Sequence, residues 1–253
     1  MDSTPLLTVD RDSISLKDAL RYLRKTGGFQ RFIAEILRQH LLEKELNARE
    51  DLKVSEHQVE TQIWNFQRQN QLLDPTQFQK WLMSQNLNYK EFKEQVELGI
   101  KVEQLKEEVT QGELEDYFKK RKDSLDKVAL SRIILEERDH AQDLRQKLEG
   151  DRTQFEALAK EHSIVEDRIS GGQMGVLRRG VLPDVLRTEL DTASEGDIIG
   201  PIEVDNRHCM FRVDKFLDAS LENPAIAREL KHQLFERWIQ EKLSKMNIKL
   251  EQS

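Results

Sequence analysis

Apolar residues recur every three or four positions along the first half of the chain, which is the spacing of one face of an α-helix. A clear example is the stripe between positions 29 and 41, which consists of Phe29, Phe32, Ile33, Ile36, Leu37 and Leu41. Residue types that cap helix N-termini precede several such stretches, at Ser15, Ser55, Asp74 and Asn88. Apart from a short strand pair at residues 5–14, the pattern predicts that residues 1–122 form a helical module.

From Lys127 onward the period changes to two. Residues 128–135 are largely apolar on both faces of the strand they predict, which indicates a central strand covered on both sides. Six of the 11 glycines follow between Gly171 and Gly200, so this region is rich in turns. The pattern predicts helices at 138–149 and 152–162, a short strand after Gly172, and strands at 198–204 and 208–216.

A last amphipathic helix runs from about residue 223 to 246. It places Ile226, Leu230, Leu234 and Trp238 on one face, with Phe235, Ile239 and Leu243 beside it. A helix at the end of a chain must bury such a stripe against another element. We therefore predict three segments, namely a helical domain at 1–122, a mixed domain at 126–217, and a helix at 223–250 that packs on the first domain.

Composition and charge exclude several classes of protein. The formal net charge is −7 over 253 residues and no basic stripe occurs, which argues against a nucleic-acid binder. No stretch approaches the roughly 20 apolar residues that span a bilayer, and the N-terminus carries no secretory signal. We therefore expect a cytoplasmic protein, although a chain already trimmed of its leader would give the same sequence. The sequence does not decide the oligomeric state.

Five short motifs follow one another in the second half of the chain. Each motif alone is weak evidence for a family, but their combination in this order is specific. They are Ser131–Leu135, Phe155–Ser163, Gly171–Gly175, Leu182-Pro183 and Gly196–Pro201. In this order the segment 126–217 resembles a parvulin-type peptidyl-prolyl isomerase domain, and the whole layout resembles SurA- and PrsA-type chaperone foldases. The resemblance implies an α+β fold, in which a helical chaperone-like module, completed by a C-terminal helix, carries an inserted FKBP-like domain of antiparallel sheet and helices. It also implies unfolded or proline-containing polypeptide as the partner, and no cofactor.

Prolyl isomerisation makes and breaks no covalent bond, and its barrier of about 18–20 kcal/mol is the loss of amide resonance. A catalyst needs a dry pocket for the ring and polar groups around the amide that stabilise its twisted state. Parvulins supply these groups with a paired-histidine network. The positions that the resemblance implies here are Arg132, Val165 and Cys209 for the polar network, with His208 as the alternative to Cys209, and Met174, Leu182 and Val185 for the substrate pocket.

Most polar positions of that network are substituted, so the leading hypothesis is a foldase or chaperone with weak or absent isomerisation. It would hold extended peptide in a helical groove and in a parvulin-like cleft. One alternative is an active isomerase with rearranged groups, in which the Arg132 guanidinium faces the amide nitrogen rather than pairing with a nearby acid. Another is a module dedicated to one partner peptide.

Other chemistry is disfavoured by the sequence. Cys209 has no evident orienting partner for a thiolate nucleophile, so a buried, inert thiol is expected. The six histidines show no spacing typical of a metal site. The tryptophans Trp64, Trp81 and Trp238 stand among apolar helical positions, which is more typical of a core than of a client-binding surface.

Overall fold

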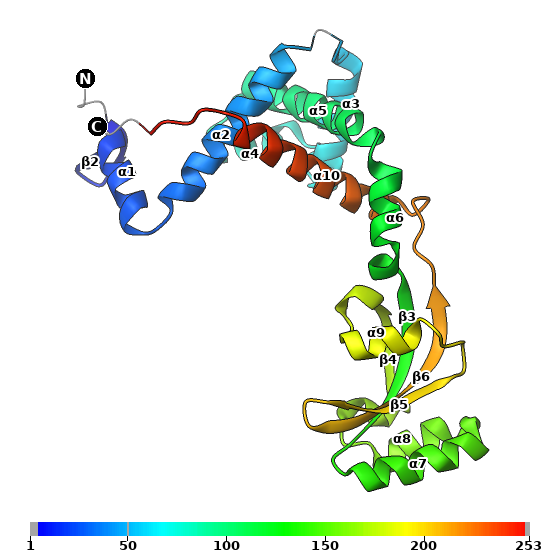
Figure 1. Ribbon diagram of the computed structural model, residues 1–253. Coiled ribbons are helices and arrows are strands. Elements are labelled where there is room, and N and C mark those ends of the chain that lie inside the picture. Colours follow the sequence, from blue (N-terminus) through cyan, green and yellow to red (C-terminus); the bar gives the residue numbers. More distant parts are fainter. Residues whose placement is uncertain (1–4, 50, 251–253) are drawn as a thin grey trace. The chain divides into compact units, whose positions relative to one another are not determined.

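The computed structural model describes residues 5–49 and 51–250. The chain divides into two compact units, one within Met1–Glu113 and Lys231–Ser253 and the other within Leu114–Leu230 (Figure 1). This division differs from the segments drawn on the sequence. The helix after Gly112 and the first turns of the C-terminal helix belong to the second unit, and only the later turns belong to the first.

The first unit is a helical bundle with a small hairpin. Its helix caps form as expected. The side chains of Ser15, Ser55 and Asn88 each accept a hydrogen bond from the backbone N–H three residues on, and the side chain of that third residue accepts one from the backbone N–H of the capping residue. Asp74 caps the helix that Pro75 opens. The elements are β1 Pro5–Val9, β2 Asp12–Ser15, α1 Leu16–Lys25, α2 Phe29–Asn47, α3 Glu56–Gln69, α4 Pro75–Ser84 and α5 Tyr89–Gln111.

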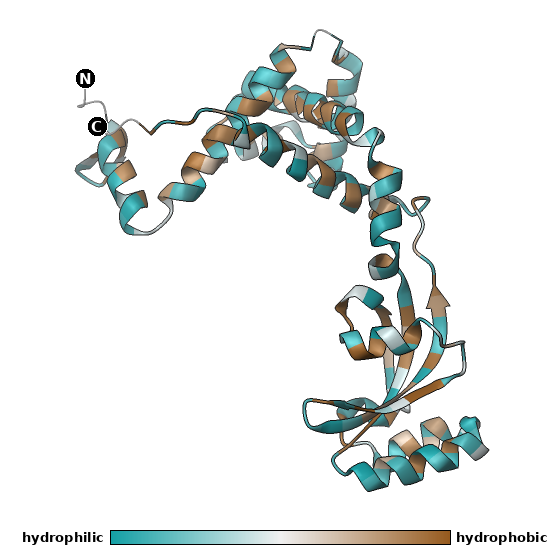
Figure 2. Cartoon of the chain, viewed as in Figure 1, coloured by the Kyte–Doolittle hydropathy of each residue, from teal (hydrophilic) through white to brown (hydrophobic). Residues whose placement is uncertain are grey.

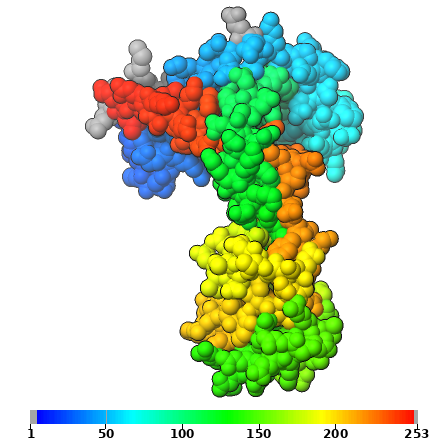
Figure 3. Space-filling view, turned by 45° about the vertical axis from the view of Figure 1, so that its right-hand side comes forward, coloured from blue at the N-terminus to red at the C-terminus, as the bar shows by residue number. Residues whose placement is uncertain are grey.

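Two hydrophobic clusters hold this unit together. One joins α2, α5 and the later turns of α10 (Pro224–Ser244) through Leu41, Leu42, Leu105, Phe235 and Ile239. Figure 3 shows this C-terminal part of the chain, in red, on the surface of the first unit. The other joins α3, α4 and α5 through Val59, Ile63, Phe78, Leu82 and Phe92. The helices show alternating hydrophobic and hydrophilic bands, as expected when one stripe of each is buried (Figure 2).

The second unit is built on an antiparallel sheet with the strand order β4-β3-β6-β5. The expectation of a covered central strand at 128–135 is confirmed, because β3 is flanked by β4 and β6 and most of its residues are buried. The elements are α6 Leu114–Leu125, β3 Lys127–Leu135, α7 Arg138–Gly150, α8 Phe155–His162, β4 Gln173–Arg178, α9 Asp184–Leu190, β5 Ile198–Val204 and β6 Arg207–Leu217, with short 3-10 turns at 152–154, 166–170 and 179–181.

The two faces of the sheet have separate cores. Ile133, Leu135 and Met210 pack against α7 and α8 on one face. Leu130, Ile134 and Phe211 pack on the other face with Leu186 and Leu190 of α9 and with other apolar residues. Figure 1 shows α9 on one side of the sheet and α7 with α8 on the other. The unit thus has the sheet-plus-helices architecture that the resemblance implied, and the whole chain is α+β.

The C-terminal helix α10 contributes to both units. Ile226 and Leu230 lie in a cluster with Leu125 and Ala219 in the second unit, whereas Phe235 and Ile239 lie in the first. The sequence interpretation assigned the entire helix to the helical module, because a continuous stripe does not reveal that its two ends have different partners. No helix in the described part of the chain is long and apolar enough to cross a membrane.

Candidate functional site

The α9 side of the sheet collects most of the residues singled out from the sequence. Cys209 and Leu182 are buried there, and Val165 and Met174 are partly buried against them. Strand register places Arg132 on the same face, since Arg132 is paired with Phe211 and Ile134 with Cys209, and directly opposite residues point to the same side. We call these residues, together with Phe211, the α9-face cluster.

His208 and Val185 do not join this cluster. His208 is opposite Leu135 of β3 and Glu203 of β5, so it lies on the face that carries α7 and α8. Of the two neighbouring candidates on β6, it is therefore Cys209 that faces the cluster. Val185 lies on α9 with its side chain exposed to solvent, whereas Leu186 next to it is buried.

Arg132 forms an ion pair with Asp167, the pairing that the sequence left as an alternative. Arg132 Nε donates to Asp167 Oδ2 at 2.7 Å, and the two side chains are 31% and 19% exposed. Sequence reasoning missed Asp167, because it lies in the 3-10 turn 166–170, two residues beyond the position at which the resemblance implies a polar group, Val165. The presence of an unmatched arginine on a central strand was the only signal that pointed to such an acid.

Glycines bring that turn against the strand. Arg132 N–H donates to Gly172 O at 2.8 Å, and Gly172 N–H donates to Asp167 O at 2.9 Å. Gly172 has a φ of 80°, and a Cβ there would lie 2.1 Å from Arg132 O. Only glycine permits this backbone approach, so the Gly171-Gly172 pair fixes Asp167 beside Arg132.

The end of α8 holds the neighbouring part of β3. Ser163 is buried, and its Oγ accepts from Ile134 N–H at 3.1 Å, while Ile164 N–H donates to Ile134 O at 3.0 Å. His162 stacks edge-on against His140, with ring centroids 5.0 Å apart. The two hydrogen bonds to Ile134 connect the backbone of β3 to the end of α8, so they help to fix the strand that carries Arg132.

Cys209 has the surroundings of an inert thiol. Burial raises the pKa of the Cys209 thiol, and Arg132 and Arg207 oppose this effect only in part. Its Sγ lies 3.9 Å from Arg207 O, as a weak donor. Since a nucleophilic cysteine needs a lowered pKa, the geometry favours a packing role.

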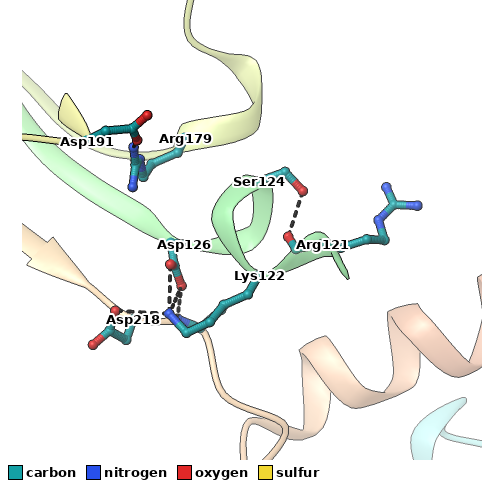
Figure 4. A network of polar contacts seen from close by, with 8 residues as sticks. Arg121, Lys122, Ser124, Asp126, Arg179, Asp191 and Asp218 are labelled. Atoms are coloured by element: carbon teal, nitrogen blue, oxygen red, sulfur yellow. Dashed lines mark hydrogen bonds and ion pairs between the residues drawn. The ribbon is translucent and has the colours of Figure 1, made fainter. Parts of the chain in front are cut away.

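A separate polar network ties together the ends of β3 and β6 (Figure 4). Asp126 is buried and accepts from Lys122 Nζ at 2.7 and 2.9 Å and from Ala219 N–H at 2.7 Å. The hydrogen bond to Asp126 raises the pKa of Lys122. Arg179 pairs with Asp191 nearby. Every oxygen of the buried carboxylate has a donor, so this network is structural.

The first unit carries an apolar hollow between α3 and α5, of about 470 Å³. Gly99 lies in the middle of α5, and a Cβ there would meet nothing within 4 Å. Trp64 of α3 is half exposed and lies under the guanidinium of Arg68, contrary to the expectation that it is a core residue. We call this hollow the α3–α5 groove; it is lined by Gln62, Phe66, Phe92, Val96, Gly99, Ile100 and Glu103.

Metal chemistry gains no support from the described residues. Within 5–49 and 51–250, no group of three or more His, Cys, Asp or Glu side chains is placed to hold a metal ion. In the second unit, the partly buried side chains of Val165 and Met174 and the Arg132 guanidinium are open to a ligand. In the first unit, the apolar groove is open to one.

Comparison with protein families identifies the second unit. Residues 109–229 match the family model of the PPIC-type PPIase domain. A search of curated proteins found no match.

Solved structures resemble the chain over both units. The peptidylprolyl isomerase PrsA from Bacillus cereus is 22% identical, with 100% of this chain and 95% of that chain covered and a TM-score of 0.53. PrsA from Bacillus anthracis is 21% identical, over 87% of this chain and 100% of that chain, with a TM-score of 0.44. The first of these matches shows that the two units share a fold with a helical module joined to such a domain.

Proposed function

Since residues 109–229 are a parvulin-type domain, joined in this chain to a helical module, we propose that the protein is a foldase or chaperone that binds extended polypeptide, with weak or absent prolyl isomerisation. The single observation that carries the proposal is the α9-face cluster. It keeps the apolar wall of Met174 and Leu182, while its polar positions hold an arginine already paired with Asp167, a valine and a buried thiol.

The chemistry of these positions supports binding more than catalysis. Twisting an amide requires donors and acceptors that stabilise the twisted state more than the planar one. Val165 offers neither, and the Cys209 thiol is a weak donor whose contact is with the backbone of its own strand. An apolar surface that lacks this machinery still gains free energy by covering a proline or aliphatic side chain.

The α3–α5 groove supplies the second contact. It is apolar and open, and Gly99 adds no side chain to the surface of the groove. In the middle of a helix a glycine lowers the stability by about 0.5–1 kcal/mol relative to alanine. Because no neighbour requires a glycine there, an occupant of the groove is a physical reason for it. Two weak sites on one chain hold a long client through effective concentration.

The test is NMR exchange spectroscopy on a proline-containing peptide, with and without the full chain. We expect shifted and broadened peptide resonances, which report binding, with little increase in the cis–trans exchange rate. A Gly99→Leu variant should fill the groove and weaken binding of an unfolded client, whereas Met83→Leu, at an exposed position of α4, serves as the matched control. If the peptide spectrum does not change when the protein is added, the proposal is wrong.

An active isomerase is the second candidate, favoured by the position of Arg132 on the face of the cluster. In that case the exchange rate rises strongly in the same experiment and collapses in Arg132→Ala. The cytoplasmic location stays a prediction, which cell fractionation with an antibody to the chain tests.

A further inference from the structure

Arg132 carries hydrogen-bond donors that the described part of the chain does not use. Its Nε donates to Asp167, but the structure gives its two terminal nitrogens no partner among residues 5–49 and 51–250. These nitrogens are also not among the buried polar atoms, so they reach solvent beside the α9-face cluster. A guanidinium has five N–H donors, and those on the terminal nitrogens are therefore open to a ligand.

Asp167 makes no hydrogen bond to such a ligand, and acts on it through the position of Arg132 and through its own charge. One oxygen, Oδ2, accepts from Arg132 Nε, and the other, Oδ1, is buried without a partner in the described part of the chain. Since Oδ1 is inaccessible, Asp167 does not touch a ligand itself. The backbone contacts of Arg132 and Asp167 with Gly172 fix both residues, so the guanidinium is held in one orientation before a ligand arrives.

The charge of the pair decides which acceptor fits. The net charge of Arg132 with Asp167 is zero, so the pair itself offers a carboxylate ligand no net attraction, and the nearby charge of Asp167 repels it. A neutral carbonyl oxygen accepts from the guanidinium without this repulsion. Met174, which is only partly buried and belongs to the same cluster as the buried Leu182, adds apolar surface to this side of the sheet.

We propose that the terminal nitrogens of Arg132 bind a backbone carbonyl of an extended, uncharged peptide segment, whose apolar side chain packs on Met174. Asp167 is the positioning residue that holds the guanidinium and selects against acidic segments. This inference rests on the proposed function, because it assigns the ligand of the parvulin-type domain.

The experiment titrates the full chain with two amidated peptides, Ala-Leu-Pro-Ala and Ala-Glu-Pro-Ala, and follows the amide resonances of Gly171 and Gly172. We expect the uncharged peptide to bind more tightly. Arg132→Gln should weaken its binding about tenfold, the loss of a hydrogen bond to a charged group, and Arg132→Lys should restore only part of it. Asp167→Asn should reverse the preference toward the glutamate peptide, an effect that a merely structural role does not produce.

Arg178→Gln is the matched control, because Arg178 forms a bidentate pair with Glu229 in the same unit but is not in the cluster. It should bind both peptides as the wild type does. If Arg132→Gln binds the uncharged peptide as tightly as the wild type, the inference fails while the proposed function stands. If the wild type binds neither peptide, both fail. Thermal unfolding checks that each variant is folded. If both Arg132 variants are unfolded, the peptide preference of Asp167→Asn alone decides. An unchanged preference in that variant would then overturn the inference.

Discussion

At the scale of single residues, the candidate site depends on contacts that close only in the folded chain. Strand alternation predicts that either His208 or Cys209 faces the cluster, but the register that selects Cys209 includes an irregularity between Ala129 and Leu130. A bulge of this kind leaves little trace in sequence. Asp167 was missed for a similar reason, since its contact with Arg132 requires the glycine turn to fold back on β3.

This turn gives a sharp prediction for Gly172→Ala. The added Cβ would lie 2.1 Å from a backbone oxygen, at a φ of 80°. We expect a loss of more than about 2 kcal/mol in the free energy of unfolding, measured by urea denaturation. Gly175→Ala is the control, because its φ is 76° and a Cβ there has nothing within 4 Å. It should lose only about 1 kcal/mol, and equal losses would show that the close approach is unimportant.

The Arg38–Glu236 pair in the first unit makes part of the stability depend on pH. Arg38 donates to both oxygens of Glu236, at 2.6 and 2.8 Å, and this hydrogen bond holds the pKa of Glu236 below its ordinary 4.5, with help from Arg38, His232 and Lys106 charges. A lowered pKa in the folded state adds stability above about pH 4.5, and this stability is lost as the pH falls through the folded value.

We therefore expect wild type to exceed Glu236→Gln in stability at pH 7, by less than about 1 kcal/mol because the pair is partly exposed. The difference should narrow as the pH falls below 4.5. Chemical denaturation of both proteins from pH 7 to pH 3 measures it. A difference that is constant over this range rules out the pair as its source.

At the scale of elements, much of the architecture could be predicted. The capping boxes at Ser15, Ser55 and Asn88, the strands at 198–204 and 208–216, and the strand pair near residue 10 all appear in the structure. These signals are local, so a sequence carries them directly. The two partners of α10 could not be predicted, because they depend on which distant clusters its apolar residues meet.

The later turns of α10 should be essential to the first unit. Phe235 is buried against α2 and α5, so Phe235→Ala should cost about 3–5 kcal/mol through lost burial and a residual cavity. Met83→Ala, at a position 70% exposed, should change stability by less than about 0.5 kcal/mol. Urea denaturation followed by tryptophan fluorescence compares them, and a small effect of Phe235→Ala would contradict the packing described here.

At the scale of the whole molecule, the proposal places one weak peptide site in each unit. A long unfolded client that reaches both should bind more tightly than a short peptide that reaches one. We expect Gly99→Leu and Arg132→Gln each to remove most of this gain, because either single change weakens one of the two contacts that the long client makes at the same time. Isothermal titration with a permanently unfolded protein measures the three affinities. A long client that binds the wild type no more tightly than a short peptide does would indicate that the two sites act separately.

The placement of α10 also has a consequence for how the protein is made. The helix α10 supplies part of one hydrophobic cluster in each unit, through Ile226 and Leu230 in one and Phe235 and Ile239 in the other. During synthesis neither of these two clusters is complete until the turns of α10 have left the ribosome. Until α10 emerges, Leu125 and Ala219 in one unit and Leu41, Leu42 and Leu105 in the other lack part of the apolar surface that covers them.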